Sequence, residues 1–146
     1  MKISGSVTVP APQERAYTLL QDPEVLAKCM PGTDQLQKVG ENEYDMKMKV
    51  LIASIGGLFA GKVRLDDQHP PQSFKLIVEG NGKIGFLKGE GLMNLTPNGD
   101  SSTEVKYDGD VQVGGTIASV GQRLLDTTAK LIIKKFFEKF TESVTA

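Results

Sequence analysis

The chain has 146 residues, with 17 Lys and Arg against 18 Asp and Glu, and it contains one His, one Cys and no Trp. This length fits one domain, expected to span residues 1–146, which can bury a core without disulfides. A net charge near −1 supplies no field that would attract nucleic acid, so no nucleic-acid partner is expected. A single Cys cannot form an internal disulfide, and no apolar run reaches the roughly 20 residues of a membrane span. We therefore expect a soluble, cytoplasmic protein.

The first third of the chain predicts one strand and two short helices. Residues 1–9 alternate between apolar and polar side chains, which is the pattern of a half-buried strand. Pro12 suits the first position of a helix. Asp22 is a typical N-cap before Pro23 and predicts a second helix, which Pro31-Gly32 ends.

Residues 33–113 predict strands almost throughout. Strict alternation runs through 44–52, 59–66, 74–79, 91–95 and 103–113. Asn81-Gly82 and Asn98-Gly99 are residue pairs typical of hairpin turns. Strands joined by tight turns indicate an antiparallel meander with one face toward solvent.

The last third predicts a long helix that Thr116 caps and that continues to about residue 141. At 1.5 Å per residue this helix would be on the order of 39 Å long, enough to cross a whole sheet. One apolar stripe along it comprises Ile117, Val120, Leu124, Thr128 and Leu131, joined by Leu125, Ile132 and Phe136. The order of elements predicts an α+β domain in which a curved antiparallel sheet faces this helix.

The concave face of such a sheet predicts a cavity for a lipophilic small molecule, because its inward residues are apolar and carry few charges. Gly61, Gly91 and Gly109 occupy inward positions and would bend the strands and leave space. The candidate ligand-binding residues are Met48, Val50, Phe59, Val63, Leu76, Met93, Tyr107, Leu124, Thr128 and Leu131. Tyr44 or Tyr107 could donate a hydrogen bond to a ligand carbonyl. The alternative is that these residues pack a solid core.

Two further segments are candidate functional surfaces. Ile55, Gly56, Gly57 and Leu58 belong to a glycine-rich turn that could gate the cavity, or they form an ordinary hairpin. Ile133, Phe137 and Phe140 form a second apolar stripe on the long helix, flanked by lysines. Such a stripe suits a partner protein, a homodimer or an anionic membrane surface. The alternative is packing against the first strand or the short helices.

Other motifs favour structural explanations. Residues 80–85 match G-x-G-x-x-G, but a strand pattern follows where the dinucleotide-binding motif needs a helix, so a hairpin is expected. His69 lies in a polar turn and is expected at the surface, and Cys29 is expected to be a buried small hydrophobe. No pair of residues with acid and base roles faces inward. We predict no catalytic residues, no metal ligands and no covalent cofactor.

Three segments resemble the CoxG family, named for the CoxG subunit of carbon monoxide dehydrogenase, within the START-like, or SRPBCC, superfamily. They are DPEVLAKCMPG at 22–32, FAGKVRLDD at 59–67 and VGGTIASVGQRLLDTTAKLIIKKFF at 113–137. The resemblance implies a helix-grip fold, with about seven antiparallel strands wrapped around a long C-terminal helix and two short helices after strand 1.

The resemblance also implies a function. It suggests a non-catalytic accessory protein that binds a lipophile, such as an isoprenoid quinone, and serves a carbon monoxide dehydrogenase-type molybdenum hydroxylase. Peripheral contact with the inner face of the cell membrane is part of this expectation, although the chain stops at Ala146, without the longer tail of some members. The alternatives are a docking adaptor without a ligand and a cyclase- or hydrolase-like enzyme of the same superfamily.

Overall fold

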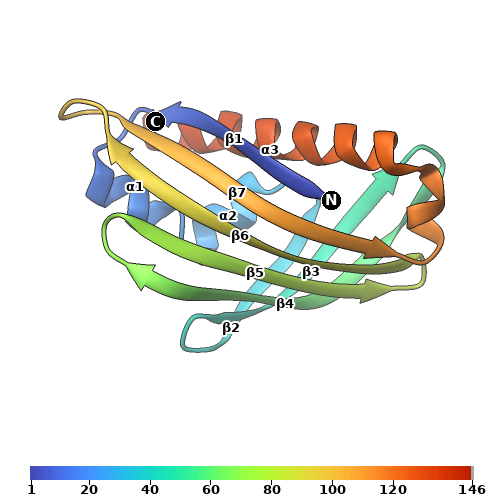
Figure 1. The fold of residues 1–146 in the computed structure, drawn as a ribbon. Helices are drawn as coiled ribbons and strands as arrows, with labels where there is room; N and C mark the ends of the chain where they lie inside the picture. The colour runs from blue at the N-terminus through green and yellow to red at the C-terminus, as the bar shows by residue number, and fades with distance from the viewer. Residues whose placement is uncertain (146) are drawn as a thin grey trace.

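The computed structural model describes residues 1–145, apart from the side chain of Gln35. Seven strands form one antiparallel sheet in the order β1-β7-β6-β5-β4-β3-β2 (Figure 1). In chain order the elements are β1 (Lys2–Val9), α1 (Gln13–Leu19), α2 (Pro23–Cys29), β2 (Thr33–Gly40), β3 (Glu43–Ile52), β4 (Ile55–His69), β5 (Ser73–Gly82), β6 (Gly85–Pro97), β7 (Thr103–Gly114), the 3₁₀ helix η1 (Thr116–Val120) and α3 (Gln122–Thr145).

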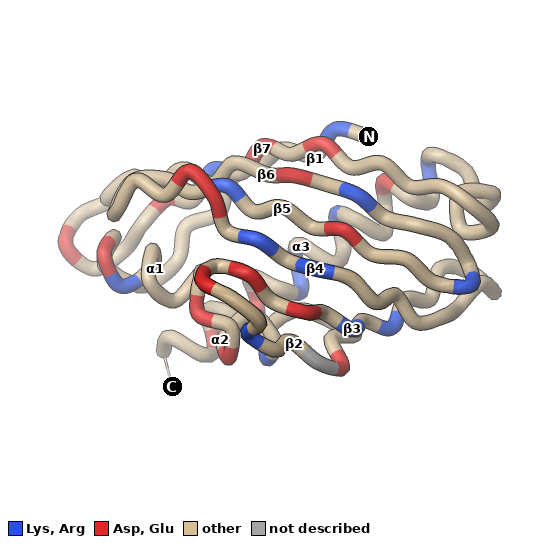
Figure 2. Tube along the Cα trace, turned by 90° about the horizontal axis from the view of Figure 1, so that it is seen from below, with Lys and Arg blue, Asp and Glu red and all other residues tan. Residues whose placement is uncertain are grey.

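The sheet is strongly curved, and α3 lies across its open, concave side, while α1 and α2 cover one end (Figure 1). Residues of both charge signs are distributed along β4–β7 (Figure 2). On β4, β6 and β7 the exposed residues alternate with buried or half-buried ones over most of each length, whereas the first six residues of β5 are all buried or half-buried. The expected α+β arrangement of a curved antiparallel sheet, a long C-terminal helix and two short helices after the first strand is therefore confirmed.

The two short helices begin where their capping residues predict. The carboxylate of Asp22 accepts a hydrogen bond from the backbone N–H of Glu24 at 2.9 Å, and Pro23 opens α2. This side-chain bond satisfies one of the N–H groups that a helix start leaves without a partner. Pro12 takes the N-cap position of α1 instead of the predicted first helical position, and no side chain caps that helix.

The long helix is broken near its predicted start. Residues 116–120 form η1, and Gly121 follows with φ 98°, a conformation that residues with a side chain rarely adopt. The α-helix proper therefore runs from Gln122 to Thr145, later at both ends than predicted.

Two glycine assignments differ from the prediction. Asn81-Gly82 is not a turn but the end of β5, because Gly82 pairs with Gly85 around a two-residue turn at residues 83–84. Gly61 does not leave space, since a Cβ there would overlap the backbone carbonyl of Glu79. At this position glycine allows β4 and β5 to approach closely. The hairpin expected for residues 80–85 is confirmed.

Thr103 ties the start of β7 to the link between β1 and α1. Its side chain is fully buried, and its hydroxyl donates a hydrogen bond of 2.7 Å to the carbonyl of Ala11, 92 residues away in the chain. Val9 and Val105 pack in the same fully buried region. The bond thus satisfies a carbonyl that has little access to water.

Replacing Thr103 by Val should lower the free energy of unfolding by about 1–3 kcal/mol. Valine keeps the shape but leaves the Ala11 carbonyl without its donor, and a buried unsatisfied group costs about this much. Urea unfolding followed by circular dichroism measures the change. Thr127→Val on the exposed face of α3 is the control, and an equal loss in both variants would contradict the prediction.

Candidate functional site: an apolar cavity under the long helix

A cavity of about 360 Å³ lies between the concave face of the sheet and α3. All seven strands contribute to its wall, together with α2, η1 and α3. Its volume falls at the small end of the roughly 300–1,000 Å³ typical of ligand pockets. The concave face is therefore not filled by a solid core.

Eight of the ten predicted ligand-binding residues line the cavity. They are Met48, Val50, Phe59, Val63, Leu76, Met93, Tyr107 and Thr128. The other two, Leu124 and Leu131, are 37% and 47% exposed and lie outside it. The stripe that faces the cavity contains Leu125 and Ile132 instead.

Glycines form part of the floor. Gly91 and Gly109 lie directly opposite each other on β6 and β7, and Gly89 is two residues away; all three line the cavity. A Cβ at Gly91 would meet no atom closer than 3.9 Å. The prediction that inward glycines leave space thus holds for Gly91. It does not hold for Gly109, where a Cβ would lie 3.0 Å from the backbone carbonyl oxygen of Glu90.

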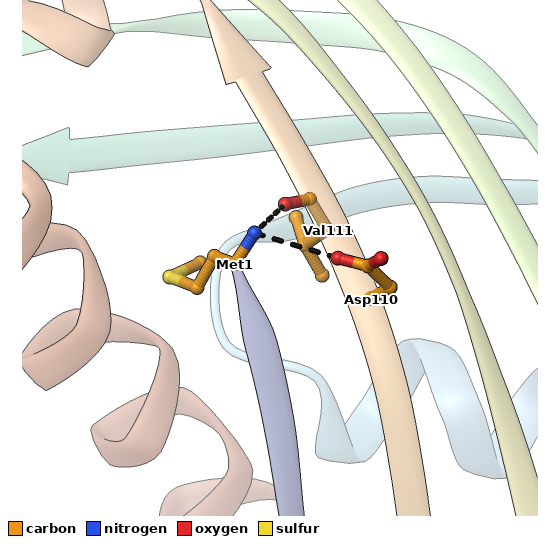
Figure 3. Close-up of polar contacts among 3 residues, drawn as sticks. All are labelled: Met1, Asp110 and Val111. Atoms are coloured by element: carbon orange, nitrogen blue, oxygen red, sulfur yellow. Dashed lines mark hydrogen bonds and ion pairs between the residues drawn. The ribbon is translucent and has the colours of Figure 1, made fainter.

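Met1 extends the wall at the edge of the sheet. Its amino group donates a hydrogen bond of 2.8 Å to the carbonyl of Val111 and lies 3.4 Å from a carboxylate oxygen of Asp110 (Figure 3). The N–H of Val111 in turn donates to the carbonyl of Met1 at 2.8 Å. These contacts hold Met1 against β7, where it joins Ile3 in lining the cavity.

Very few polar side chains border the cavity. Thr33, Thr128 and Tyr107 do so with uncharged hydroxyl groups. Glu90 and Asp108 also border it, but both are exposed, and they alternate with the inward glycines of their strands. Tyr44, the other candidate hydrogen-bond donor, is buried in the core outside the cavity. Within residues 1–145 no cluster of His, Cys, Asp and Glu could hold a metal ion.

The predicted partner surface on α3 is wrong. Phe140 is fully buried, Phe137 is 5% exposed, and Ile133 is half-buried and lines the cavity. The rings of Phe136, Phe137 and Phe140 pack on one another with centroids 5.1–6.5 Å apart. The last turns of α3 are apolar on two sides because they lie against both the sheet and α2.

The predicted gate is not a loose turn. Ile52 pairs with Ile55 around the two residues Ala53 and Ser54, so residues 55–58 belong to β4 and pair with β3. Their position beside the start of α3 agrees with the expectation (Figure 1). Ile55 packs in a second, smaller core cluster with Ile52, Phe59 and Ile117 at this end of the molecule. Gating by this hairpin stays a prediction.

The apolar cavity and the arrangement of elements agree with what comparison with known proteins finds. A family model that describes CoxG, a subunit of carbon monoxide dehydrogenase, matches residues 5–145. The chain belongs to the CoxG family. No curated protein sequence matches it.

Solved structures extend the comparison for this CoxG-family chain. A conserved protein from Geobacillus kaustophilus is 34% identical, with a TM-score of 0.94 over 99% of this chain and 95% of that one. A START superfamily protein from Mycobacterium smegmatis (16% identity, TM-score 0.75, 99% and 97% covered) and the Zhui aromatase/cyclase from a Streptomyces (15%, 0.68, 98% and 92%) share the fold. The CoxG-family chain thus has the helix-grip fold.

Several cavity residues of the CoxG-family chain were not among the predicted ligand-binding residues, although Leu125, Ile132 and Phe136 were placed in the apolar stripe of the long helix. They are Met1, Ile3, Leu20, Leu26, Met30, Leu36, Val111, Val113, Leu125, Ala129, Ile132 and Phe136. Ile3, Val111 and Val113 share the alternation of their strands, so this signal could have found them. The residues of the short helices carry no such signal, because only the packed fold brings α2 over the end of the sheet.

Cys29 and His69 lie where the sequence predicts, the thiol buried in α2 and the imidazole exposed at the end of β4. Burial raises the pKa of the Cys29 thiol; Glu142 adds to this effect, and Lys28 and Lys139 oppose it. The thiol therefore stays protonated, and hence unreactive, over a wider pH range than a free cysteine.

We expect iodoacetamide to alkylate Cys29 slowly in the native protein at pH 8 and quickly in denaturing urea. The reactive species is the thiolate. Because the pKa of Cys29 is raised, a smaller fraction of the thiol is ionised at a given pH, and a large fraction forms only above the raised pKa. Mass spectrometry over time gives both rates. Equal native and denatured rates would contradict the assignment of a buried, inert thiol.

Proposed function

We propose that this chain is a non-catalytic accessory protein that binds a lipophilic small molecule, an isoprenoid quinone, and serves a carbon monoxide dehydrogenase-type molybdenum hydroxylase. The apolar cavity under α3 is the observation that supports the binding role. Membership of the CoxG family supports the association with the oxidoreductase.

The cavity suits an apolar ring better than a charged or strongly polar metabolite. Within residues 1–145 its walls offer apolar contacts and three hydroxyl groups, and the two carboxylates that border it are exposed. Transferring a charged group into it would therefore carry a large desolvation cost. About 360 Å³ accommodates a substituted ring with a short chain, whereas a long isoprenoid tail exceeds this volume. We therefore assign the ring of the quinone to the cavity and leave most of its tail outside.

An enzyme of the same fold is the second candidate, because an aromatase/cyclase is among the structural neighbours. Cyclase chemistry needs groups that give and take protons beside the ligand. Within residues 1–145, Tyr107 is the one cavity-lining residue that carries a conventional general acid and is at least half-buried, since Glu90 and Asp108 are exposed. The docking-adaptor alternative relied on an exposed apolar stripe on the long helix. It is no longer supported, because Phe137 and Phe140 are buried.

Organic extraction of the purified protein, followed by mass spectrometry, tests the proposal together with titrations of short-tailed menaquinone and ubiquinone. A stoichiometric lipophile, or saturable binding of either quinone, is the expected result. An empty protein that binds neither quinone would overturn the proposal. Chemical conversion of a bound compound in single turnover would favour the enzyme.

We also propose peripheral membrane contact, but at a different surface from the predicted stripe. One end of the molecule gathers the β3–β4 hairpin, the β5–β6 turn and the start of α3 (Figure 1). Four of the seven exposed large hydrophobic residues lie there: Leu51, Leu58, Phe86 and Leu124. Exposed apolar side chains at hairpin ends can insert at the level of lipid headgroups.

The charge of this hairpin end fits an anionic surface. Residues 46–61, 80–87 and 111–125 contain Lys47, Lys49, Lys83 and Arg123 but no Asp or Glu. The rest of the chain carries all 18 acidic residues, with Asp126 just beyond the border of the patch. No helix within residues 1–145 is long and apolar enough to span a bilayer, so contact would be peripheral.

Vesicles of phosphatidylcholine with 30% phosphatidylglycerol should bind the protein, and Lys49→Gln with Lys83→Gln should weaken binding about 25-fold. Each cation near an anionic surface contributes about 1 kcal/mol, which is about fivefold. Sedimentation with vesicles measures the affinity. Lys38→Gln with Lys135→Gln, away from this end, is the charge-matched control. No binding, or equal loss in both double variants, would contradict the proposal.

A further inference from the structure

A groove on the surface runs beside the cavity, between the edge strand β1 and α3. It has a volume of about 580 Å³. Its walls are Ser6, Val7 and Tyr107 on the sheet and Lys130, Ile133, Lys134, Phe137, Glu138, Thr141 and Glu142 on α3. The rim is thus polar, with two cations and two carboxylates, whereas the neighbouring cavity is apolar.

Three side chains belong to both spaces. Tyr107, Ile133 and Phe137 line the cavity on one side and the groove on the other. The rings of Tyr107 and Phe137 are stacked, with centroids 6.0 Å apart and planes 20° apart. These three residues therefore separate the cavity from the groove by the thickness of one side chain, and we call them the partition.

The hydroxyl of Tyr107 lies over the edge strand β1, which forms one wall of the groove. Tyr107 on β7 is paired with Gly5 on β1, and a Cβ at Gly5 would overlap the Tyr107 hydroxyl and ring. The ring therefore extends across β1, the last strand of the sheet, toward its open edge. Tyr107 is half-buried, and within residues 1–145 its hydroxyl makes no hydrogen bond.

We propose that this groove is the mouth of the cavity, and that Tyr107 donates a hydrogen bond to an oxygen of the ligand there. The ligand class is then an amphiphile: an apolar body occupies the cavity, and an oxygen-bearing end meets the hydroxyl and the polar rim. This inference rests on the proposed binding function and adds where the ligand enters and what fixes its orientation.

Two probes with the same carbon skeleton test the hydrogen bond. 2,3-Dimethyl-1,4-naphthoquinone has two carbonyl oxygens that 2,3-dimethylnaphthalene lacks, and its methyl groups block addition of thiols. Tyr107→Phe should weaken binding of the quinone about fivefold and leave the hydrocarbon within twofold, as expected for one hydrogen bond. Tyr44→Phe, a tyrosine outside both spaces, should change neither affinity. Calorimetric titration measures all of them.

Two neighbouring isoleucines test the mouth. Ile133 belongs to the partition, whereas Ile132 lines the cavity alone. Ile133→Ala should raise the association and dissociation rates of both probes about tenfold and change their affinity less than threefold. Ile132→Ala should leave the association rate unchanged. Stopped-flow mixing resolves the rates, and circular dichroism confirms that both variants are folded.

The outcomes separate this inference from the binding function itself. If neither probe binds the unaltered protein, the proposed function and the mouth both fail. If both probes bind but Tyr107→Phe weakens them equally or not at all, the hydrogen bond is overturned and the binding function stands. If Ile133→Ala leaves the association rate unchanged, entry is elsewhere.

Discussion

Replacing Gly91 by Leu is expected to abolish binding of 2,3-dimethyl-1,4-naphthoquinone while the protein stays folded. Gly91 is part of the cavity floor, and a Cβ there meets no atom within 3.9 Å. The new side chain would therefore extend into the cavity without displacing the backbone, and would occupy the space of the ring. We expect the affinity to fall at least 50-fold in a calorimetric titration.

Leu92→Phe is the matched control for Gly91→Leu. Leu92 is the next residue of β6 and is 39% exposed on the outer face, so the larger ring adds volume outside the cavity. This variant should keep its affinity within twofold. If Gly91→Leu binds as well as the unaltered protein and is folded by circular dichroism, the cavity is not the binding site.

Phe140→Ala is expected to lower the free energy of unfolding by about 3–5 kcal/mol, the range for removing a large aromatic side chain from a core. Phe140 is fully buried and packs against Phe136 and Phe137. Urea unfolding gives the value. Leu131→Ala on the same helix is the control, since Leu131 is 47% exposed and should cost less than about 0.5 kcal/mol. A small effect at Phe140 would restore the idea of an exposed apolar stripe.

Strand alternation predicts the face of the sheet that lines the cavity, as Met48, Val50 and Leu76 show. It does so because successive side chains of a strand point to opposite sides whatever the tertiary structure. Alternation does not tell how far along a strand the cavity extends. Tyr44 has the same parity as Met46 and Met48, yet it lies in the core beyond the cavity.

For the long helix α3, the sequence predicts the element but not which of its side chains face the cavity. Its existence is evident from composition, but its apolar residues surround much of the axis, so the pattern does not tell which of them face the cavity. Leu125 and Ile132 line it, whereas Leu124 and Leu131 are exposed. The burial of Phe137 and Phe140 follows from contacts of α3 with α2, an element more than 100 residues earlier, which no local pattern records.

The sheet does not close into a barrel, because β1 and β2 are its two edges, and this affects the range of ligand sizes that the protein can bind. The strands are hydrogen-bonded to one another, whereas α3 rests on them through apolar side chains. We expect a larger occupant to displace α3 rather than to separate the strands, because side-chain contacts can be exchanged without breaking the hydrogen bonds of the sheet. In a series of homologous ligands, each added group would then change the packing of α3 by a small amount. We therefore expect the affinity to vary gradually with ligand size, without an abrupt cut-off.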